Sequence, residues 1–206
     1  MTKMQSEALH GGAMPSGWLN RPLCRHYVLG IFDAATVRWR AADGWREHPV
    51  HWGIGCLPDG ECDLLGAWVE PERSSGTPPR MFADLERRGV ERMSHVIGAS
   101  DGHLPERASA AFAGSTLGAS VDPRLAEALA PSRRRGLPSP VRVAEQVRER
   151  LLRAIRRRGS FENESSVLDF LADALQRMEH RLDSGGPMAT VGGRLDRGAL
   201  MAPPGL

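Results

Sequence analysis

The first seventy residues alternate short apolar runs with turn-forming residues. Residues 27–33 are apolar almost throughout, which is typical of a buried strand, and residues 36–40 alternate in a way that would continue it. Residues 50–57 and 64–69 predict two further strands. Turn signals such as the Pro-Asp-Gly segment at 58–60 leave only short connections between these runs, so we expect an antiparallel meander.

Beyond residue 76 the spacing of apolar residues predicts helices that alternate with single strands. Prolines in a first turn and a glycine stop predict a helix over 77–89. A short apolar run at 95–100 predicts a fourth strand, which stops at Asp101-Gly102. Weaker signals predict a helix at 105–112, a strand at 116–121 and a helix at 122–130. Because a strand reached through a helical crossover normally runs parallel to its partner, this order predicts an α/β fold with a mixed five-stranded sheet and flanking helices.

A segment rich in proline, serine and arginine, residues 131–140, separates this region from the C-terminal part of the chain. Apolar residues at helical spacing then predict two helices, over 141–158 and 163–182. We therefore expect five parts along the chain. They are a flexible leader at 1–22, an α/β core at 23–130, the linker at 131–140, C-terminal helices at 141–183 and a disordered tail at 184–206.

The most informative feature of the composition is that nearly all basic residues are arginines. The 206 residues carry a formal net charge of +2, yet Lys3 is the only lysine among 27 basic residues. Guanidinium groups suit phosphate recognition, although a GC-rich coding sequence gives the same bias. Residues 133–158 hold ten arginines against two glutamates. This run indicates either a DNA-backbone contact surface or a solvated helix face.

Other chemistry-bearing residues give weaker signals. The three cysteines lack metal-site spacing and are expected to be reduced thiols. His48 and His51 also lack a metal motif, and His103 is more typical of a surface turn. No run approaches the roughly 20 apolar residues of a membrane helix, and no signal peptide is evident. The sequence thus predicts a cytoplasmic protein without membrane contact or an evident small-molecule substrate.

Two carboxylates stand near the ends of apolar strands. Asp33 closes the first predicted strand, and Asp101 follows the fourth. If these strands pair in parallel, both side chains emerge at one sheet edge, where two close carboxylates need a cation between them. Mg²⁺ or Mn²⁺ held by such oxygen ligands could activate a water or hydroxyl for phosphodiester cleavage. An aspartate at a strand end is also an ordinary turn former or helix cap, so spacing alone leaves both interpretations open.

The residues around these carboxylates resemble one family. The sequence resembles the mutator-type transposases of bacterial insertion sequences in a nearly continuous match over 27–112. Successive segments of that family are matched by residues 32–40, 55–69, 82–90 and 96–102. The resemblance implies a ribonuclease-H-like catalytic domain of the DDE type that uses Mg²⁺ or Mn²⁺. It assigns Asp33 and Asp101 as the first and second catalytic, metal-binding aspartates.

A second block resembles the helix that carries the family's third carboxylate and ends in a basic run. The resemblance assigns this role to Glu149, because the family segment matches Glu149-Arg150-Leu151 followed by the basic run at 155–158. Anchoring on Phe161 instead points to Glu145, whose neighbours match poorly. The alternative for Glu149 is a solvated helix residue paired with Arg153 at i+4. For DNA contact we expect the arginines of this helix, namely Arg148, Arg153, Arg156, Arg157 and Arg158.

Three departures from the family pattern qualify these implications. Only 32 residues precede Asp33, where the family has a long DNA-binding region. Asp101 and Glu149 are 48 positions apart, where the family has a long insertion. Residues 115–130 lack the family's Cys and His. We therefore expect a shortened transposase that binds DNA and performs metal-dependent strand cleavage and transfer. The alternative is a non-catalytic remnant that binds DNA or a full-length transposase. Catalytic activity and homo-oligomer formation stay open at this point.

Overall fold

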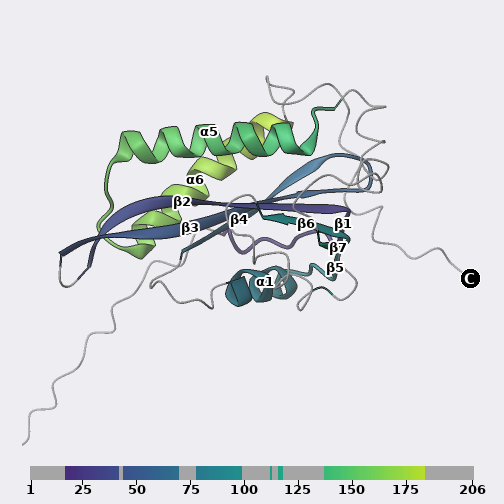
Figure 1. Cartoon of the computed structure of the whole chain (residues 1–206), viewed down its shortest axis with the longest axis horizontal. Helices are drawn as coiled ribbons and strands as arrows, with labels where there is room; N and C mark the ends of the chain where they lie inside the picture. Colours follow the sequence, from purple (N-terminus) through teal and green to yellow (C-terminus); the bar gives the residue numbers. More distant parts are fainter. Residues whose placement is uncertain are drawn as a thin grey trace, which may run out of the picture.

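The computed structural model describes residues 17–41, 44–69, 78–98, 112, 116–117 and 137–183. Over these residues the chain forms a mixed α/β structure in three layers (Figure 1). Helices α5 (Pro140–Arg158) and α6 (Glu164–Asp183) cover one face of a sheet, and helix α1 (Pro78–Arg87) covers the other. The α/β class predicted from the sequence is confirmed. No helix within the described ranges is long and apolar enough to cross a membrane.

Five strands form the main sheet, in the order β4-β3-β2-β6-β7. β2 (Leu29–Ala41) pairs antiparallel with β3 (Gly44–Cys56) along its whole length, and β3 pairs antiparallel with β4 (Cys62–Val69). β6 (His95–Gly98) runs parallel to β2, and β7 (Thr116–Leu117) runs parallel to β6. The expected meander and the expected parallel pairing beyond it are both present.

Two features of the strands differ from what the sequence predicts. The first strand continues past Asp33 to Ala41, as the alternation at 36–40 allowed, and its partner β3 begins at Gly44, six residues before the expected start at 50. In addition, a separate two-stranded sheet joins β1 (His26–Tyr27) in parallel to β5 (Arg92–Met93). Strands of two residues carry no periodicity, so the hydrophobic pattern could not have indicated them.

Alternation along β2 separates two apolar cores. Leu29 and Ile31 pack into the core beneath α5 and α6, whereas Phe32 belongs to the core on the α1 side. The Phe32 ring meets the Phe82 ring of α1 edge-on, with 5.5 Å between ring centroids. On the neighbouring strand, a Cβ added at Gly53 would lie 2.6 Å from the Phe32 ring. Close packing of this aromatic ring on the backbone therefore requires glycine at position 53.

Both C-terminal helices have clear local boundary signals. Ser139 caps α5 by accepting a hydrogen bond from the backbone N–H of Arg142, and Gly159 ends the helix with φ at 81°. Asn163 caps α6, since its Oδ1 accepts from the Ser166 N–H at 2.9 Å. α5 lies over β2 and α6 over β4. Their apolar stripes join the sheet in a single core, so both helices are integral to it.

The described N-terminal residues are also fixed to this core. Trp18 and Leu19, which fall within the expected leader, are buried. Trp18 Nε1 donates to Glu179 Oε2 of α6 at 2.6 Å, and Arg21 Nη2 pairs with Glu179 Oε1 at 2.8 Å. Residues 1–16, the tail, residues 131–136 of the expected linker, the helix expected at 122–130, and all but residue 112 of the helix expected at 105–112 lie outside the described residues.

Candidate functional site

Asp33 lies in the middle of the central strand β2, on the face covered by α5 and α6. It stands two residues from both Ile31 and Ala35, which belong to that core, and only 4% of its surface is exposed. Its Oδ1 accepts a hydrogen bond from the backbone N–H of Ala34 at 2.8 Å. A buried carboxylate is costly unless its charge is compensated. Asp33 is therefore a buried residue inside a paired strand and does not form a turn.

The compensating charge comes from α5. Arg148 Nε lies 3.4 Å from Asp33 Oδ2, and the Arg148 side chain is 52% exposed whereas that of Asp33 is 3% exposed. The ion pair thus joins a buried carboxylate to a guanidinium at the edge of the core. A metal ion at Asp33 Oδ2 would compete with this guanidinium for the same oxygen. The sequence predicted Arg148 as a DNA contact and gave no sign of this pairing.

Asp101, the second predicted carboxylate, lies outside the described residues, as does His103. The strand that leads to Asp101 is described, and it pairs in parallel with β2 as expected. The last registered pair, Phe32 with Gly98, lies one residue before Asp33 and three residues before Asp101. The position of the Asp101 carboxylate relative to that of Asp33 lies outside what the structure describes.

Glu149, the predicted third carboxylate, is exposed on α5. The preceding residue, Arg148, is the one that reaches Asp33. Since each residue advances a helix by about 100°, Glu149 is turned away from the side on which Arg148 meets Asp33. Among the ion pairs of the described residues none joins Glu149 to Arg153, the alternative that helical spacing suggests. Glu145 is exposed as well. Within the described ranges, no three His, Cys, Asp or Glu side chains cluster as a metal site would require.

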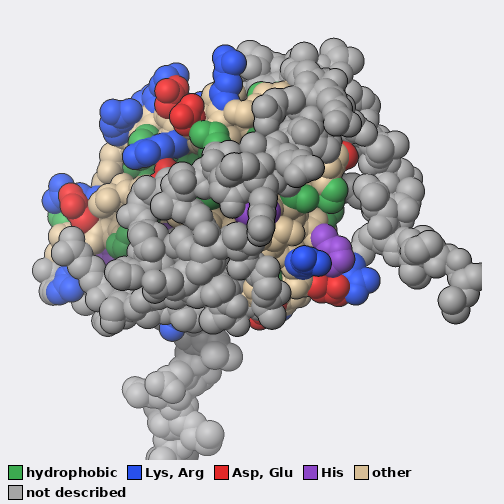
Figure 2. Space-filling model, turned by 45° about the vertical axis from the view of Figure 1, so that its right-hand side comes forward, with side chains coloured by type: hydrophobic (Ala, Val, Ile, Leu, Met, Phe, Trp, Pro, Cys, Tyr) green, Lys and Arg blue, Asp and Glu red, His purple; other side chains and the backbone are tan. Residues whose placement is uncertain are grey.

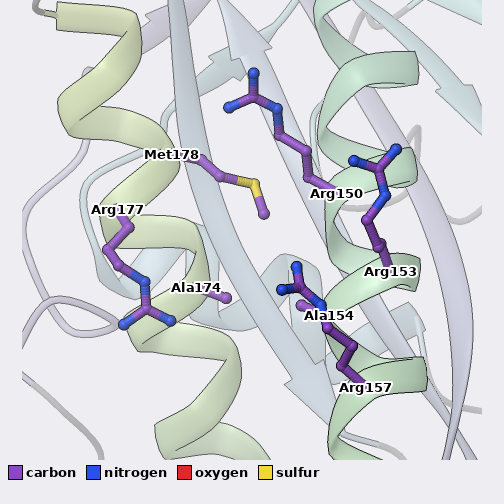
Figure 3. Close-up of a pocket in the computed structure, with 7 residues that line it drawn as sticks. All are labelled: Arg150, Arg153, Ala154, Arg157, Ala174, Arg177 and Met178. Carbon is purple, nitrogen blue, oxygen red and sulfur yellow. The ribbon is translucent and has the colours of Figure 1, made fainter.

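The arginines predicted to contact DNA divide into groups with different surroundings. Arg148 pairs with Asp33, the Arg156 Nε–H donates to Leu152 O of the same helix at 3.3 Å, and the Arg158 guanidinium lies 5.8 Å from the centre of the Phe161 ring. The other two, Arg153 and Arg157, line a cleft between α5 and α6 (Figure 3).

Sequence reasoning missed two further arginines of this cleft, Arg150 of α5 and Arg177 of α6. A usable signal was present, because positions 150, 153 and 157 recur at the spacing that places residues on one helix face. Arg177 carried no such signal, since its place depends on how α6 docks beside α5. In Figure 2, basic side chains stand over the upper part of the molecule, where Figure 1 places α5, with acidic side chains among them.

The other buried polar groups have structural roles. The Tyr27 hydroxyl donates to Asp63 Oδ2 at 3.0 Å, and burial, followed by the Asp63 charge, raises the Tyr27 pKa far above its usual value. Arg88 is buried with its Nη1 donating to Leu65 O at 2.6 Å, and burial lowers its pKa. None of the three cysteines forms a disulfide. The hydrogen bond with Cys56, and then burial, raise the pKa of the Cys62 thiol, which makes it a poor nucleophile.

Comparison with known proteins points to one family. A model of the Mutator family of transposases matches residues 12–117. The transposase for insertion sequence element ISRM3 of Rhizobium meliloti (strain 1021) is 33% identical over 97 residues, which are 46% of this chain and 24% of the relative. A probable transposase for an ISRM3-like element of Sinorhizobium fredii (strain NBRC 101917 / NGR234) is 32% identical over the same shares. The chain spans about a quarter of the length of these curated relatives.

Among solved structures, one similar chain comes from the intasome of simian T-cell lymphotropic virus in complex with PP2A regulatory subunit B56 gamma. The similarity covers 79% of this chain and 52% of that chain, at 11% sequence identity and a TM-score of 0.30. At this level the similarity assigns neither a fold family nor a function.

Proposed function

The chain belongs to the Mutator family of transposases, and on this premise we propose that it acts on insertion-sequence DNA by metal-dependent strand cleavage and transfer. The matched region includes both Asp33 and Asp101. We further propose a ribonuclease-H-like fold for the sheet region. The support for it is the order β4-β3-β2-β6-β7, with β2 antiparallel to β3 and parallel to β6.

The observation that carries the catalytic proposal is the setting of Asp33. It is a buried carboxylate in the central strand, and Asp101 follows the last residue of the parallel neighbouring strand, Gly98, by three positions in the sequence. A guanidinium already lies beside Asp33 Oδ2, so this oxygen faces a place where a positive charge is accommodated. In the proposal Asp33 and Asp101 hold Mg²⁺ or Mn²⁺, and Glu149 is the third carboxylate.

The metal would activate the attacking oxygen and stabilise the leaving oxygen of a phosphodiester. In the proposed reaction the residues of this chain position the carboxylate and attract the DNA. Backbone pairing of β2 and the Ala34 N–H hold the Asp33 carboxylate in one orientation. The arginine-rich face of α5 supplies the positive charge that attracts the DNA backbone. With Glu149 exposed, its role requires that α5 or its side chains rearrange when DNA and metal bind.

A strand-cleavage assay tests the proposal. The full chain is incubated with duplexes that carry insertion-sequence ends, with Mn²⁺, Mg²⁺ or a chelator. We expect metal-dependent nicking that disappears in Asp33→Asn and Asp101→Asn and persists in Asp169→Asn, a partly exposed aspartate of α6. Nicking that survives in both site variants, or that needs no metal, would refute the assignment of these aspartates.

A second candidate function is a non-catalytic protein that binds DNA or a full-length transposase. The ion pair between Asp33 and Arg148 favours it, because this pair occupies the carboxylate that catalysis needs, and the exposed Glu149 favours it too. The two candidates separate cleanly. Salt-sensitive DNA binding without metal-dependent nicking on any duplex supports the non-catalytic function. Nicking that depends on Asp33 excludes it.

A further inference from the structure

We propose that the cleft between α5 and α6 is a binding site for a phosphate group of the DNA backbone, an assignment that rests on the proposed function for its ligand. Four arginines line the cleft, three from α5 (Arg150, Arg153 and Arg157) and one from α6 (Arg177). Ala154 and Met178 complete most of the lining. In Figure 3 the side chains of Arg150, Arg157 and Met178 extend into the space between the two helices.

The shape of the cleft suits a small anion. Positions 150, 153 and 157 share one face of α5, so all three arginines line the same side of the helix. The small side chain of Ala154 stands among them and leaves room between the helices. The cleft has a volume of about 330 Å³, roughly ten times the share of one water molecule in the liquid. A phosphate group fits there together with part of its hydration shell.

The charge of the cleft is not balanced by the protein. Among the described residues no ion pair joins Arg150, Arg153 or Arg157 to a carboxylate. Arg177 lies 4.0 Å from Asp173, but both side chains are more than 60% exposed, so solvent screens this pair. The Nη1 atom of Arg150 is buried and has no hydrogen-bond partner. An oxyanion in the cleft would satisfy this donor and reduce the repulsion among the guanidinium groups.

The surroundings favour a backbone phosphate over an isolated anion. The basic surface continues past the cleft along α5, where Arg156 and Arg158 are exposed near the C-terminal end of the helix. A polyanion with regularly repeated phosphates can occupy the cleft and the continuing surface together. Guanidinium forks also match the oxygens of a phosphate in pairs. The cleft would then fix one backbone position, whereas the remaining arginines attract the strand without fixing it.

The first test compares cleft arginines with arginines outside the cleft. Binding of a fluorescent duplex of arbitrary sequence is measured by anisotropy between 50 and 200 mM salt for wild type, Arg150→Gln and Arg157→Gln. Arg156→Gln and Arg158→Gln remove the same charge from the same helix and serve as controls. The slope is that of the logarithm of the binding constant against the logarithm of the salt concentration, and loss of one phosphate contact makes it shallower by about 0.9. Between 50 and 200 mM salt the variant's affinity should therefore fall by a factor roughly 3.5-fold smaller than that of the wild type. We expect this change in the cleft variants and a smaller one in the controls. Equal changes in all four variants would show that the cleft is no site.

A second readout needs no DNA. We expect inorganic phosphate to raise the melting temperature of the wild-type chain, and we expect Arg150→Gln and Ala154→Glu, which places a carboxylate in the cleft, to abolish that shift. Phosphate stabilisation without any DNA binding would preserve the cleft as an anion site and refute the proposed DNA function. DNA binding without phosphate stabilisation, and with equal loss in cleft and control variants, would overturn the cleft and leave the proposed function standing. Displacement of DNA by polyglutamate at equal charge concentration would overturn the assignment to phosphate.

Discussion

At the scale of single residues, the central observation is that a candidate catalytic carboxylate already has a cationic partner. Arg148 reaches Asp33 from α5 and lies beside the buried oxygen that holds the metal in the proposed mechanism. The sequence singled out Asp33 as a candidate metal ligand, which stays a prediction, and gave no sign that Arg148 is its partner. The apolar stripe of α5, which includes Val143, Val147 and Leu151, places position 148 beside the core-facing side of the helix and position 149 on the opposite side. Helical spacing therefore favoured Arg148 over Glu149 as the residue that reaches the sheet.

Replacing Arg148 should show whether its guanidinium competes with a metal ion for Asp33. In Arg148→Gln we expect Mn²⁺ to raise the melting temperature more than in wild type, because the guanidinium no longer occupies Asp33 Oδ2. Without metal the same variant should lose about 1 kcal/mol of unfolding free energy, a modest value because Arg148 is half exposed. Arg153→Gln removes an equal charge from the same helix, away from Asp33, and serves as the control. An equal response to Mn²⁺ in both variants would contradict the competition.

Tyr27 offers a direct test of burial, because it is the only tyrosine in the chain. Burial, followed by the charge of Asp63, raises its pKa well above the usual value of 10. The folded state therefore keeps the proton above pH 10 while the unfolded state releases it, so stability falls as pH rises past 10. The slope should be about 1.4 kcal/mol per pH unit. Tyrosinate absorbance should stay absent until the chain unfolds, and should appear near pH 10 in denaturant. Titration near pH 10 in the folded chain would contradict this environment.

At the scale of elements, hydrophobic periodicity predicted the long pieces and missed the short ones. The strands of the meander and the helices α5 and α6 appear where the apolar pattern placed them. The apolar run ended at Asp33, and the alternation at 36–40 indicated that the strand could continue beyond it. The structure shows that pairing with β3 carries the strand on to Ala41. The β1–β5 pair joins segments more than sixty residues apart, and two-residue strands leave no trace in the sequence pattern.

Contact between β3 and the Phe32 ring gives a prediction at this scale. In Gly53→Ala the new Cβ would lie 2.6 Å from that ring, which is itself held against Phe82. We expect a loss of about 1–3 kcal/mol in unfolding free energy from overpacking. Gly17→Ala, where nothing lies within 4 Å of the added Cβ, should change stability by less than about 0.5 kcal/mol. The strain should be partly relieved when Phe32→Leu is combined with Gly53→Ala, and additive losses would count against the contact as its cause.

At the scale of the whole molecule, the sequence suggested a core followed by a linker and separate C-terminal helices. In the structure α5 and α6 cover the face of the sheet that carries Asp33, and their apolar residues belong to the same core as those of β2, β3 and β4. The linker composition marked a change along the chain, but composition carries no information on whether the segments beyond it dock. Docking depends on the match between the stripe of each helix and the apolar face of the sheet. That match also brings Arg148 to Asp33 and forms the arginine cleft.

A truncation tests this shared core. A chain that ends at residue 139 lacks α5 and α6 and would expose an apolar sheet face that includes Leu29, Ile31, Trp52 and Leu64. We expect no cooperative thermal transition, binding of an apolar dye, and aggregation, because a sheet needs a covering layer to bury such a face. A chain that ends at residue 183 keeps both helices, and it should unfold cooperatively with a melting temperature close to that of the full chain. Cooperative unfolding of the shorter chain would show that the sheet is stable by itself. In that case α5 would be free to leave Asp33, and the ion pair with Arg148 would not limit access to the carboxylate.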